Sequence, residues 1–191
     1  MRRAAPALVV SLLFSLGLSA CSSGGPTAGA PAPPGVAPPE GAAEAARIDR
    51  VLAGLDGVIG DLQRILVRER RITPEVTDRL QSIYTGPELL NQIDAFRADV
   101  AAGLVGYRKP PGNRLTTVSR LITVSPICVF VEVTRDYGPI AEGPAPPPSS
   151  LYVVLVTKSE ADDPRQLNPT PWAMLYDGVQ ADGSEPEDVC R

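Results

Sequence analysis

The sequence predicts an α+β domain in which helices come first and an antiparallel sheet follows. Between residues 44 and 103 the apolar residues recur at steps of three and four, which is the period of amphipathic helices. From Leu115 onward the apolar residues are largely β-branched and their spacing shortens, as is typical of strands. Helices followed by consecutive strands favour a sheet of about four antiparallel strands with the helices packed on one face.

The first 20 residues have the layout of a secretory signal peptide. A basic Met1-Arg2-Arg3 precedes an apolar run over residues 7–18, which is shorter than the ~20 apolar residues of a membrane-spanning helix. Leu18-Ser19-Ala20-Cys21 resembles the lipobox of bacterial lipoproteins. The resemblance implies cleavage after Ala20, transfer of diacylglycerol to the Cys21 sulfur, and a further acyl chain such as palmitate on the new amino group. An ordinary cleaved signal peptide is the alternative.

The lipobox resemblance implies a protein held at the extracytoplasmic face of the cell membrane by its lipid, since two or three acyl chains anchor stably where one does not. Residues 21–43 comprise the lipidated cysteine and a stretch rich in Pro, Gly and Ala, with six prolines between residues 26 and 39. This composition predicts a flexible, extended linker that buries little surface. The globular domain is expected over residues 44–191.

The first predicted helix carries its apolar stripe from Ile48 to Leu66. Gly54, Gly57 and Gly60 lie opposite that stripe, and each costs ~1 kcal/mol relative to alanine in a helix interior. We expect that this helix depends on tertiary packing or breaks near Asp56-Gly57, and we interpret it as a weak, bent surface helix. The alternative is that a neighbouring backbone approaches closely along the glycine face.

Capping signals predict the next two helices. Thr73-Pro74-Glu75 is typical of a helix start, with a capping residue, a first-turn proline and an acidic residue near the positive helix end. Thr85 and Glu88 have the spacing of a capping box that opens a third helix, for which Gly103 is the expected C-terminal cap.

Four strands are expected over residues 118–125, 127–137, 151–157 and 172–176. The third is apolar on both faces, which favours a central position in the sheet. The proline-rich residues 138–150 predict an exposed loop, residues 160–166 a polar turn, and Asp177-Gly178 a turn after the last strand. We expect Trp172 to seal one end of the sheet rather than to serve as a ligand platform.

The order of these elements over residues 44–176 resembles the cone-shaped fold of the nuclear transport factor 2-like (SnoaL, cystatin-like) superfamily. The resemblance implies an apolar pocket between helix and sheet, which in some relatives is an enzyme site built from an acid and a tyrosine. The stretch Asn168-Pro169-Thr170-Pro171-Trp172, before Tyr176-Asp177-Gly178, also resembles C-terminal segments of actinobacterial envelope lipoproteins without assigned function.

The composition excludes several classes of function. The chain has 18 basic residues, 22 acidic residues and no histidine, and loss of Arg2 and Arg3 leaves a formal charge of about −6. An acidic product argues against nucleic-acid binding and offers no polybasic patch to anionic lipids. Without histidine, neither a Ser-His pair nor a His-ligated metal site can form. No cofactor is indicated, and no metal, because the acidic residues 160–163 and 182–188 lack calcium-loop spacing and are interpreted as solvated turns.

Cys128 and Cys190 remain once Cys21 is assigned to the lipid. In an oxidising compartment the two are predicted to form a disulfide, and two separate buried thiols are the alternative.

No catalytic residue is assigned from sequence. Asp136 and Tyr137, at the end of the second strand, are candidates for an acid–tyrosine pair, because a carboxylate in a dry pocket gains basicity. Further candidates in the same sense are Tyr84, Tyr107, Tyr176 and Asp177.

The favoured function is that of a non-catalytic, lipid-anchored cell-envelope protein that acts as an interaction or accessory module for an envelope protein. The first alternative is a carrier of a small apolar ligand in a cone-shaped pocket. The second alternative is an enzyme with a small pocket that uses Asp and Tyr.

Overall fold

The computed structural model describes residues 41–144, 146–180 and 182–191. The predicted signal peptide, the lipobox with Cys21 and most of the predicted linker lie outside the described residues. The first helix begins at Ala42, two residues before the predicted start of the domain. In the part of the chain that is described, no helix combines the length and apolarity needed to cross a membrane.

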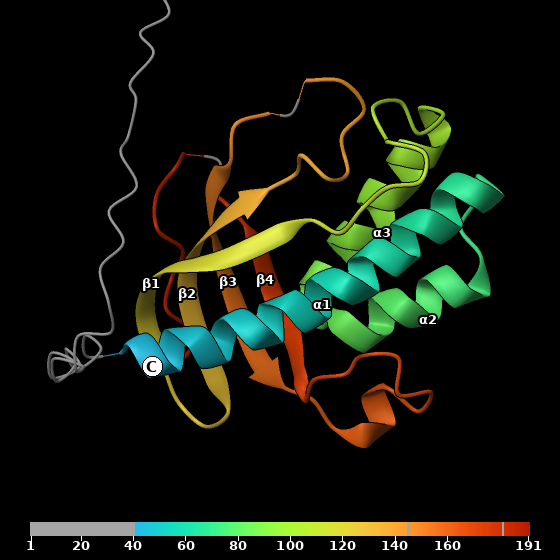
Figure 1. The fold of residues 1–191 in the computed structure, drawn as a ribbon. Helices are drawn as coiled ribbons and strands as arrows, with labels where there is room; N and C mark the ends of the chain where they lie inside the picture. Colours follow the sequence, from blue (N-terminus) through green and yellow to red (C-terminus); the bar gives the residue numbers. More distant parts are fainter. Residues whose placement is uncertain (1–40, 145, 181) are drawn as a thin grey trace, which may run out of the picture. The chain divides into compact units, whose positions relative to one another are not determined.

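The described chain is an α+β domain, as predicted. Three helices precede four antiparallel strands whose order in the sheet follows the sequence, and the helices lie on one face of that sheet (Figure 1). The third strand pairs on both sides, so its predicted central position is confirmed. The elements are α1 (Ala42–Glu69), α2 (Pro74–Ile83), α3 (Gly86–Ala101), β1 (Leu115–Val124), β2 (Cys128–Asp136), β3 (Ser149–Thr157), a short 3-10 helix (Glu160–Asp162) and β4 (Trp172–Gly178).

The core lies between the helices and the inner face of the sheet. The apolar stripe of α1 packs with α2 against alternate residues of the strands, because successive strand side chains point to opposite faces. Trp172 is 6% exposed within this core, and the Arg47 guanidinium lies over its ring at 5.8 Å, which confirms the sealing role. The inner-facing strand residues include Val129, Val131, Val133, Leu151, Val153, Leu155 and Met174.

Helix α1 runs without a break through its three glycines, so the predicted break near Gly57 is wrong. A Cβ on Gly54 would lie 2.8 Å from the Thr170 side chain, and one on Gly60 would lie 2.0 Å from Oδ1 of Asn113. Nothing lies within 4 Å of a Cβ on Gly57. Two of the three glycines therefore allow close approach by side chains of neighbouring loops.

Two carboxylates of α1 hold the outer edge of the sheet. Asp49 and Asp56 are seven residues apart and therefore lie on the same helix face. Asp49 Oδ1 accepts a hydrogen bond from the backbone N–H of Val118 at 2.7 Å, and Asp56 Oδ2 accepts one from that of Thr116 at 2.8 Å. These bonds satisfy two N–H groups on the β1 edge and tie α1 to the sheet.

The predicted starts of α2 and α3 are correct, but only one cap forms as expected. The Thr73 side chain accepts a hydrogen bond from the N–H of Val76 at 3.3 Å. Thr85 precedes α3 without a side-chain cap, and Glu88 accepts hydrogen bonds from Gln92 and Asn91 instead. The predicted capping box of α3 is therefore wrong.

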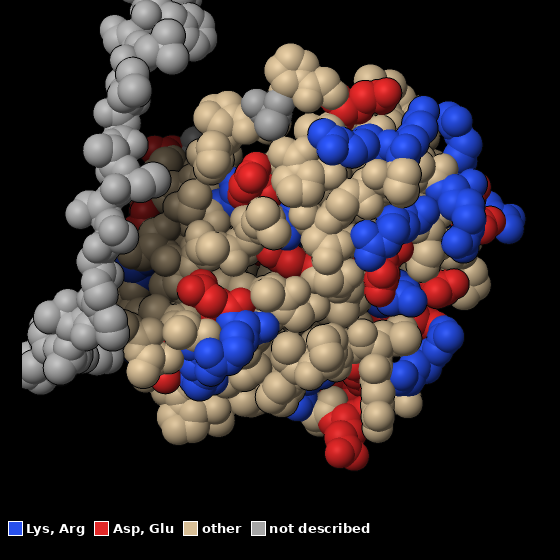
Figure 2. Space-filling view, in the orientation of Figure 1, with Lys and Arg blue, Asp and Glu red and all other residues tan. Residues whose placement is uncertain are grey.

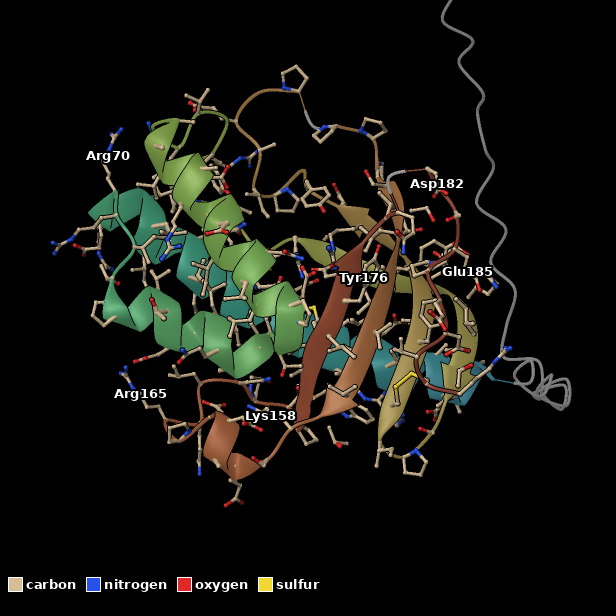
Figure 3. All side chains as sticks on the ribbon, turned by 180° about the vertical axis from the view of Figure 1, so that it is seen from behind. Arg70, Lys158, Arg165, Tyr176, Asp182 and Glu185 are labelled. Carbon is tan, nitrogen blue, oxygen red and sulfur yellow. A yellow bond between two sulfur atoms is a disulfide. The ribbon has the colours of Figure 1, made fainter. Side chains whose placement is uncertain are left out.

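The chain after β4 returns across the second face of the sheet (Figure 3). Cys128 and Cys190 form the predicted disulfide there. Arg120 of β1 pairs with Glu185 at 2.6 Å, and Pro186 is buried. The outward-facing Phe130 is fully buried, so part of the second face of the sheet is covered as well.

The turn over residues 160–166 is solvated only in part, which differs from the prediction. Asp163 is buried and accepts hydrogen bonds from Lys158 at 2.6 Å and from the N–H groups of Leu167 and Asn168 at 2.9 Å each. The carboxylate therefore organises this loop, and the burial of Asp163 replaces the predicted solvent contact.

Candidate functional site

A cavity of about 220 Å³ lies between α1, α3 and the inner face of the sheet. Its walls include Ile59 and Gln63 from α1 and Phe96 from α3. Its floor is polar, because Arg114, Arg135 and Asp177 line it where the strands would otherwise present core residues. The cavity lies between helices and sheet, where the sequence resemblance implied an apolar pocket. Its floor, however, is polar.

Arg135 enters the cavity because it continues the inner-facing side of β2. Val129, Val131 and Val133 occupy that side before it, and strand periodicity places residue 135 on the same face. The Arg135 side chain is 3% exposed. Its Nε donates to Thr116 Oγ1 at 3.0 Å and its Nη1 donates to Asp177 Oδ1 at 2.6 Å. The guanidinium is thus held at two of its three nitrogens.

Asp177 reaches the same cavity through a β-bulge. Met174 pairs with Leu155 and Tyr176 with Val154, so Leu175 is an extra residue in β4. A bulge reverses the alternation of the residues that follow it. Asp177 therefore faces inward opposite Val153, and β4 continues through Gly178. The predicted turn at Asp177-Gly178 is wrong for this reason.

Arg114 and Asp56 complete a buried ion cluster, which we define as Asp56, Arg114, Arg135 and Asp177. Arg114 Nε donates to Asp56 Oδ1 at 2.6 Å, and its Nη2 lies 3.3 Å from Asp177 Oδ2. The four side chains are between 1% and 8% exposed. Two arginines and two aspartates give this cluster no net charge, which is the condition for burying ions at acceptable cost.

The electrostatics of the cluster keep Asp177 ionised and Tyr84 protonated. Burial favours a higher pKa for Asp177, but Arg114 and Arg135, with hydrogen bonds from Arg135 and Tyr84, outweigh burial and lower that pKa. Burial raises the pKa of Tyr84, whose hydroxyl donates to Asp177 Oδ2 at 3.3 Å. The structure thus brings Asp177 and Tyr84 together. Because its pKa is lowered, Asp177 is a weak proton acceptor.

Two buried polar atoms at this cavity have no hydrogen-bond partner among the described residues. They are Nη2 of Arg135 and Oε1 of Gln63, and both residues line the cavity. Buried polar groups are nearly always paired, and each unpaired one costs ~1–3 kcal/mol. A third such atom, Nε of Arg79, belongs to a side chain that does not line the cavity. Two of the three unpaired buried atoms among the described residues thus belong to side chains that line this cavity, which makes it the candidate binding site.

Three tyrosines among the sequence candidates, Tyr84, Tyr107 and Tyr137, line the cavity. Tyr107 donates its hydroxyl to Asp99 at 2.6 Å, and burial together with this hydrogen bond raises the pKa of Tyr107. Tyr137 lines the cavity too, but Asp136 uses its Oδ1 to accept the N–H of Gly138 and so closes a turn. The Asp136–Tyr137 pair of the sequence prediction is therefore not assembled in the cavity. Tyr176 faces away from it, opposite Val154.

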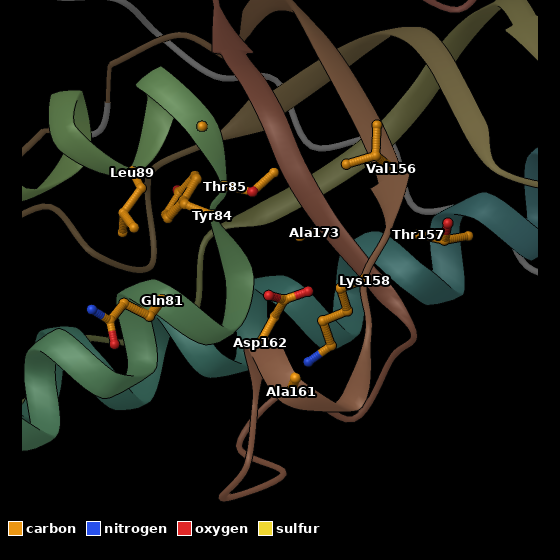
Figure 4. A pocket seen from close by; sticks show the side chains of 11 residues that line it. Gln81, Tyr84, Thr85, Leu89, Val156, Thr157, Lys158, Ala161, Asp162 and Ala173 are labelled. Carbon is orange, nitrogen blue, oxygen red and sulfur yellow. The ribbon is translucent and has the colours of Figure 1, made fainter.

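A second cavity of about 340 Å³ lies where the α2–α3 junction meets β3 and β4 (Figure 4). Figure 4 shows Lys158 and Asp162 close together on one side of it and Tyr84 with Leu89 on another. Lys158 donates to Asp163 and to the carbonyl of Ser82, and Asp162 accepts from Ser159. Its charged groups are already paired, so this larger cavity is the weaker candidate.

On the face that Figure 2 shows, charged side chains of both signs lie close to one another. Basic side chains gather at the end of the helical layer where α1 ends, with acidic ones among them (Figure 2). The exposed Arg68, Arg70 and Arg71 lie there, and Arg68 pairs with Glu69 at 2.9 Å. Among the described residues, no three side chains of His, Cys, Asp or Glu gather as they would around a metal ion.

Sequence reasoning named Tyr84, Tyr107, Tyr137 and Asp177 but missed the arginines. A signal was present, because Arg135 stands where the alternation of β2 requires an inner-facing residue. Asp56 likewise interrupts the apolar stripe of α1 beside Leu55. Charged residues at core positions mark buried ion pairs or sites. Comparisons of the chain with protein-family models, curated proteins and solved structures give no match.

Proposed function

We propose that this protein is a non-catalytic, lipid-anchored cell-envelope protein that binds a small molecule in the cavity between α1, α3 and the sheet. The observation that carries the proposal is the unpaired Nη2 of Arg135, on a side chain that is 3% exposed at the floor of that cavity. Binding sites combine a mostly enclosed volume with a few fixed polar groups. The alternative of a ligand carrier thus gains support over the interaction module favoured from sequence.

The chemistry of the floor supports binding rather than catalysis. Asp177 has a lowered pKa and accepts hydrogen bonds from two arginines and Tyr84, so three of its about four lone-pair sites are engaged. A general base needs a pKa near the working pH and a free lone pair toward the substrate. The lowered pKa of Asp177 therefore argues against that role. Its role in the proposal is to hold both arginines in place.

The location is supported by two independent features. Leu18-Ser19-Ala20-Cys21 resembles a lipobox, and the Cys128–Cys190 disulfide suits an oxidising compartment outside the cytoplasm. We place the domain on the extracytoplasmic face of the cell membrane, held by lipid on Cys21. A cone-shaped nuclear transport factor 2-like fold remains part of the proposal, supported by the order of the elements.

The anchor is tested by fractionating cells that express the wild type or Cys21→Ala. The wild type is expected in the membrane fraction and the variant in the soluble one. A variant that remains membrane-bound to the same degree would remove the anchor from the proposal.

The binding role is tested on the whole chain with Cys21→Ser, which is purified without detergent and analysed by native mass spectrometry. A small molecule is expected to co-purify and to be released on denaturation. Arg135→Met should lose this mass, whereas Arg79→Met, the same change at an arginine outside the cavity, should keep it. If circular dichroism shows Arg135→Met unfolded, Gln63→Leu replaces it. Equal retention in the cavity variant and in Arg79→Met would refute the role of the cavity.

Partner binding is a second candidate, and it is supported by one surface feature. Val124, Ile127 and Val189 are exposed by 39%, 68% and 57% around the disulfide, at the β1–β2 turn and the chain end. A photo-crosslinking residue at position 127 is expected to trap an envelope protein in intact cells. The same residue at position 90, where Leu90 is 65% exposed on α3, is the matched control. Identical crosslinks at both positions would contradict a specific interface.

A further inference from the structure

The hydrogen-bond pattern of the floor limits what the head of a ligand can be. A carboxylate or phosphate is typically gripped by two parallel N–H groups of one arginine. Arg135 has already committed Nε to Thr116 and one N–H of Nη1 to Asp177, so Nη2 is the nitrogen that remains without a partner. The paired grip needs parallel N–H groups on two nitrogens, whereas the two N–H groups of Nη2 diverge and each suits one acceptor oxygen, such as that of a carbonyl or hydroxyl group.

The charge balance points the same way. Each arginine of the buried ion cluster already has a carboxylate within 2.6 Å, so the cluster offers no surplus positive charge. Asp99 adds an acidic group to the lining, where it accepts a hydrogen bond from Tyr107. An anion at Nη2 would lie in a balanced or acidic field and would lose its hydration without compensation. The site therefore favours an uncharged head.

Gln63 adds the complementary requirement. Its Oε1 is buried without a partner among the described residues, and it accepts hydrogen bonds only. A head that satisfies both Arg135 and Gln63 needs an acceptor and a donor. A hydroxyl group or a secondary amide carries both.

The ligand also has room for an apolar part. A second opening of about 240 Å³ shares Gln63, Tyr107 and Tyr137 with the first cavity, so these three residues lie between the two. Its other walls are Val105, Gly106, Ile140 and Ala141. Of these, Val105 is 83% exposed. Neither volume alone reaches the ~300–1,000 Å³ that is usual for small-molecule sites, so a ligand of that size has to contact both. The inner end is polar and the outer end is apolar.

We propose that the ligand class is a neutral amphiphile, whose uncharged hydroxyl- or amide-bearing head binds Arg135 and Gln63 and whose apolar part lies against Val105 and Ile140. This inference rests on the proposed function and specifies it. It predicts that, among ligands with the same tail length, the protein binds those with a neutral head group more tightly than those with a charged one.

The test compares three probes with the same ten-carbon tail on the whole chain with Cys21→Ser, measured by calorimetric titration without detergent. The probes are 1-decanoylglycerol, which is neutral, sodium decanoate, which is an anion, and decyltrimethylammonium, which is a cation. The neutral probe is expected to bind at least tenfold more tightly than either ion. A tenfold difference in Kd corresponds to ~1.4 kcal/mol of binding free energy, which is about the net contribution of one hydrogen bond.

Matched variants assign that preference to the site. Gln63→Leu is expected to weaken 1-decanoylglycerol about tenfold, and Val105→Asp is expected to weaken it by removing apolar contact at the mouth. Gln81→Leu makes the same change at an exposed glutamine in the other cavity and should leave affinity unchanged. Equal losses in Gln63→Leu and Gln81→Leu would overturn the assignment.

The outcomes separate this inference from the proposed function. Tighter binding of decanoate or of decyltrimethylammonium than of 1-decanoylglycerol would overturn the neutral head, while cavity binding would stand. If no probe binds but a molecule co-purifies with the chain and is lost in Arg135→Met, the amphiphile is overturned and the binding role stands. If no probe binds and nothing co-purifies, both fail.

Discussion

Replacing Asp177 by asparagine should be among the most destabilising single changes in this domain. Asp177 is 1% exposed and lies 2.6 Å from Arg135 and 3.3 Å from Arg114. An asparagine side chain at this position would keep the shape but leave the cluster with two buried positive charges and one negative charge. Removing one partner of a buried ion pair typically costs ~3–5 kcal/mol. Domains of this size are stable by only ~5–15 kcal/mol, so the variant is expected to be marginal.

The assay is equilibrium unfolding in urea at pH 7, with the disulfide intact and circular dichroism as the signal. The expected loss appears as a lower midpoint at an unchanged slope, because the surface exposed on unfolding stays the same. Glu185→Gln is the control. It breaks the Arg120–Glu185 pair, whose side chains are 49% and 42% exposed, and surface pairs contribute ~0–1 kcal/mol.

The reasoning would be refuted if Asp177→Asn lost less than ~1 kcal/mol or matched Glu185→Gln. Such a result would mean that water reaches the arginines and replaces the carboxylate. The cluster would then not be the dry, fixed floor on which the binding proposal depends.

Three further predictions concern other parts of the domain. The pKa of Asp177 is lowered in the folded state, so its stabilisation is fully present above the unfolded pKa of ~3.9 and is lost only as pH falls through the lower folded pKa. The gap between the urea midpoints of wild type and Asp177→Asn should therefore be constant above about pH 5 and should narrow progressively below about pH 4, and a gap that does not narrow in acid would contradict this. Cys190→Ser removes the disulfide, whose cysteines are 62 residues apart, and should lower the free energy of unfolding in urea by ~4 kcal/mol. An unchanged urea midpoint would contradict a stabilising role of the disulfide. Gly57→Ala should stabilise α1 by up to ~1 kcal/mol, because nothing lies near the added Cβ. Gly60→Ala should melt at a lower temperature than Gly57→Ala in a thermal scan, because its Cβ displaces the Asn113 side chain. The reverse order of melting temperatures would contradict the close approach of Asn113 to Gly60.

The elements of this fold are legible in the sequence because each has a local cause. The apolar period of α1, the Thr73-Pro74 start of α2 and the apolar run of β3 all act within a few residues. The order of the elements then gives the antiparallel sheet. Fold class and element order could thus be predicted, with boundaries correct to within a few residues.

The candidate site could be predicted only in part, because its geometry arises from contacts distant in sequence. The bulge at Leu175 turns Asp177 inward, and nothing in residues 172–178 alone indicates it. Arg114 and Asp56 are 58 residues apart, so their pairing follows from packing. The glycine face of α1 was ambiguous for the same reason, since Thr170 and Asn113 reach it from distant loops.

The carboxylates that α1 extends along β1 limit how another chain can recognise this domain. An exposed strand edge invites a foreign segment to add itself as a further strand through main-chain hydrogen bonds. Asp49 and Asp56 already occupy the N–H groups of Val118 and Thr116 that such a segment would need. Along this stretch, a partner has to select the domain by its side chains, and the same obstruction protects it from fibrous self-association.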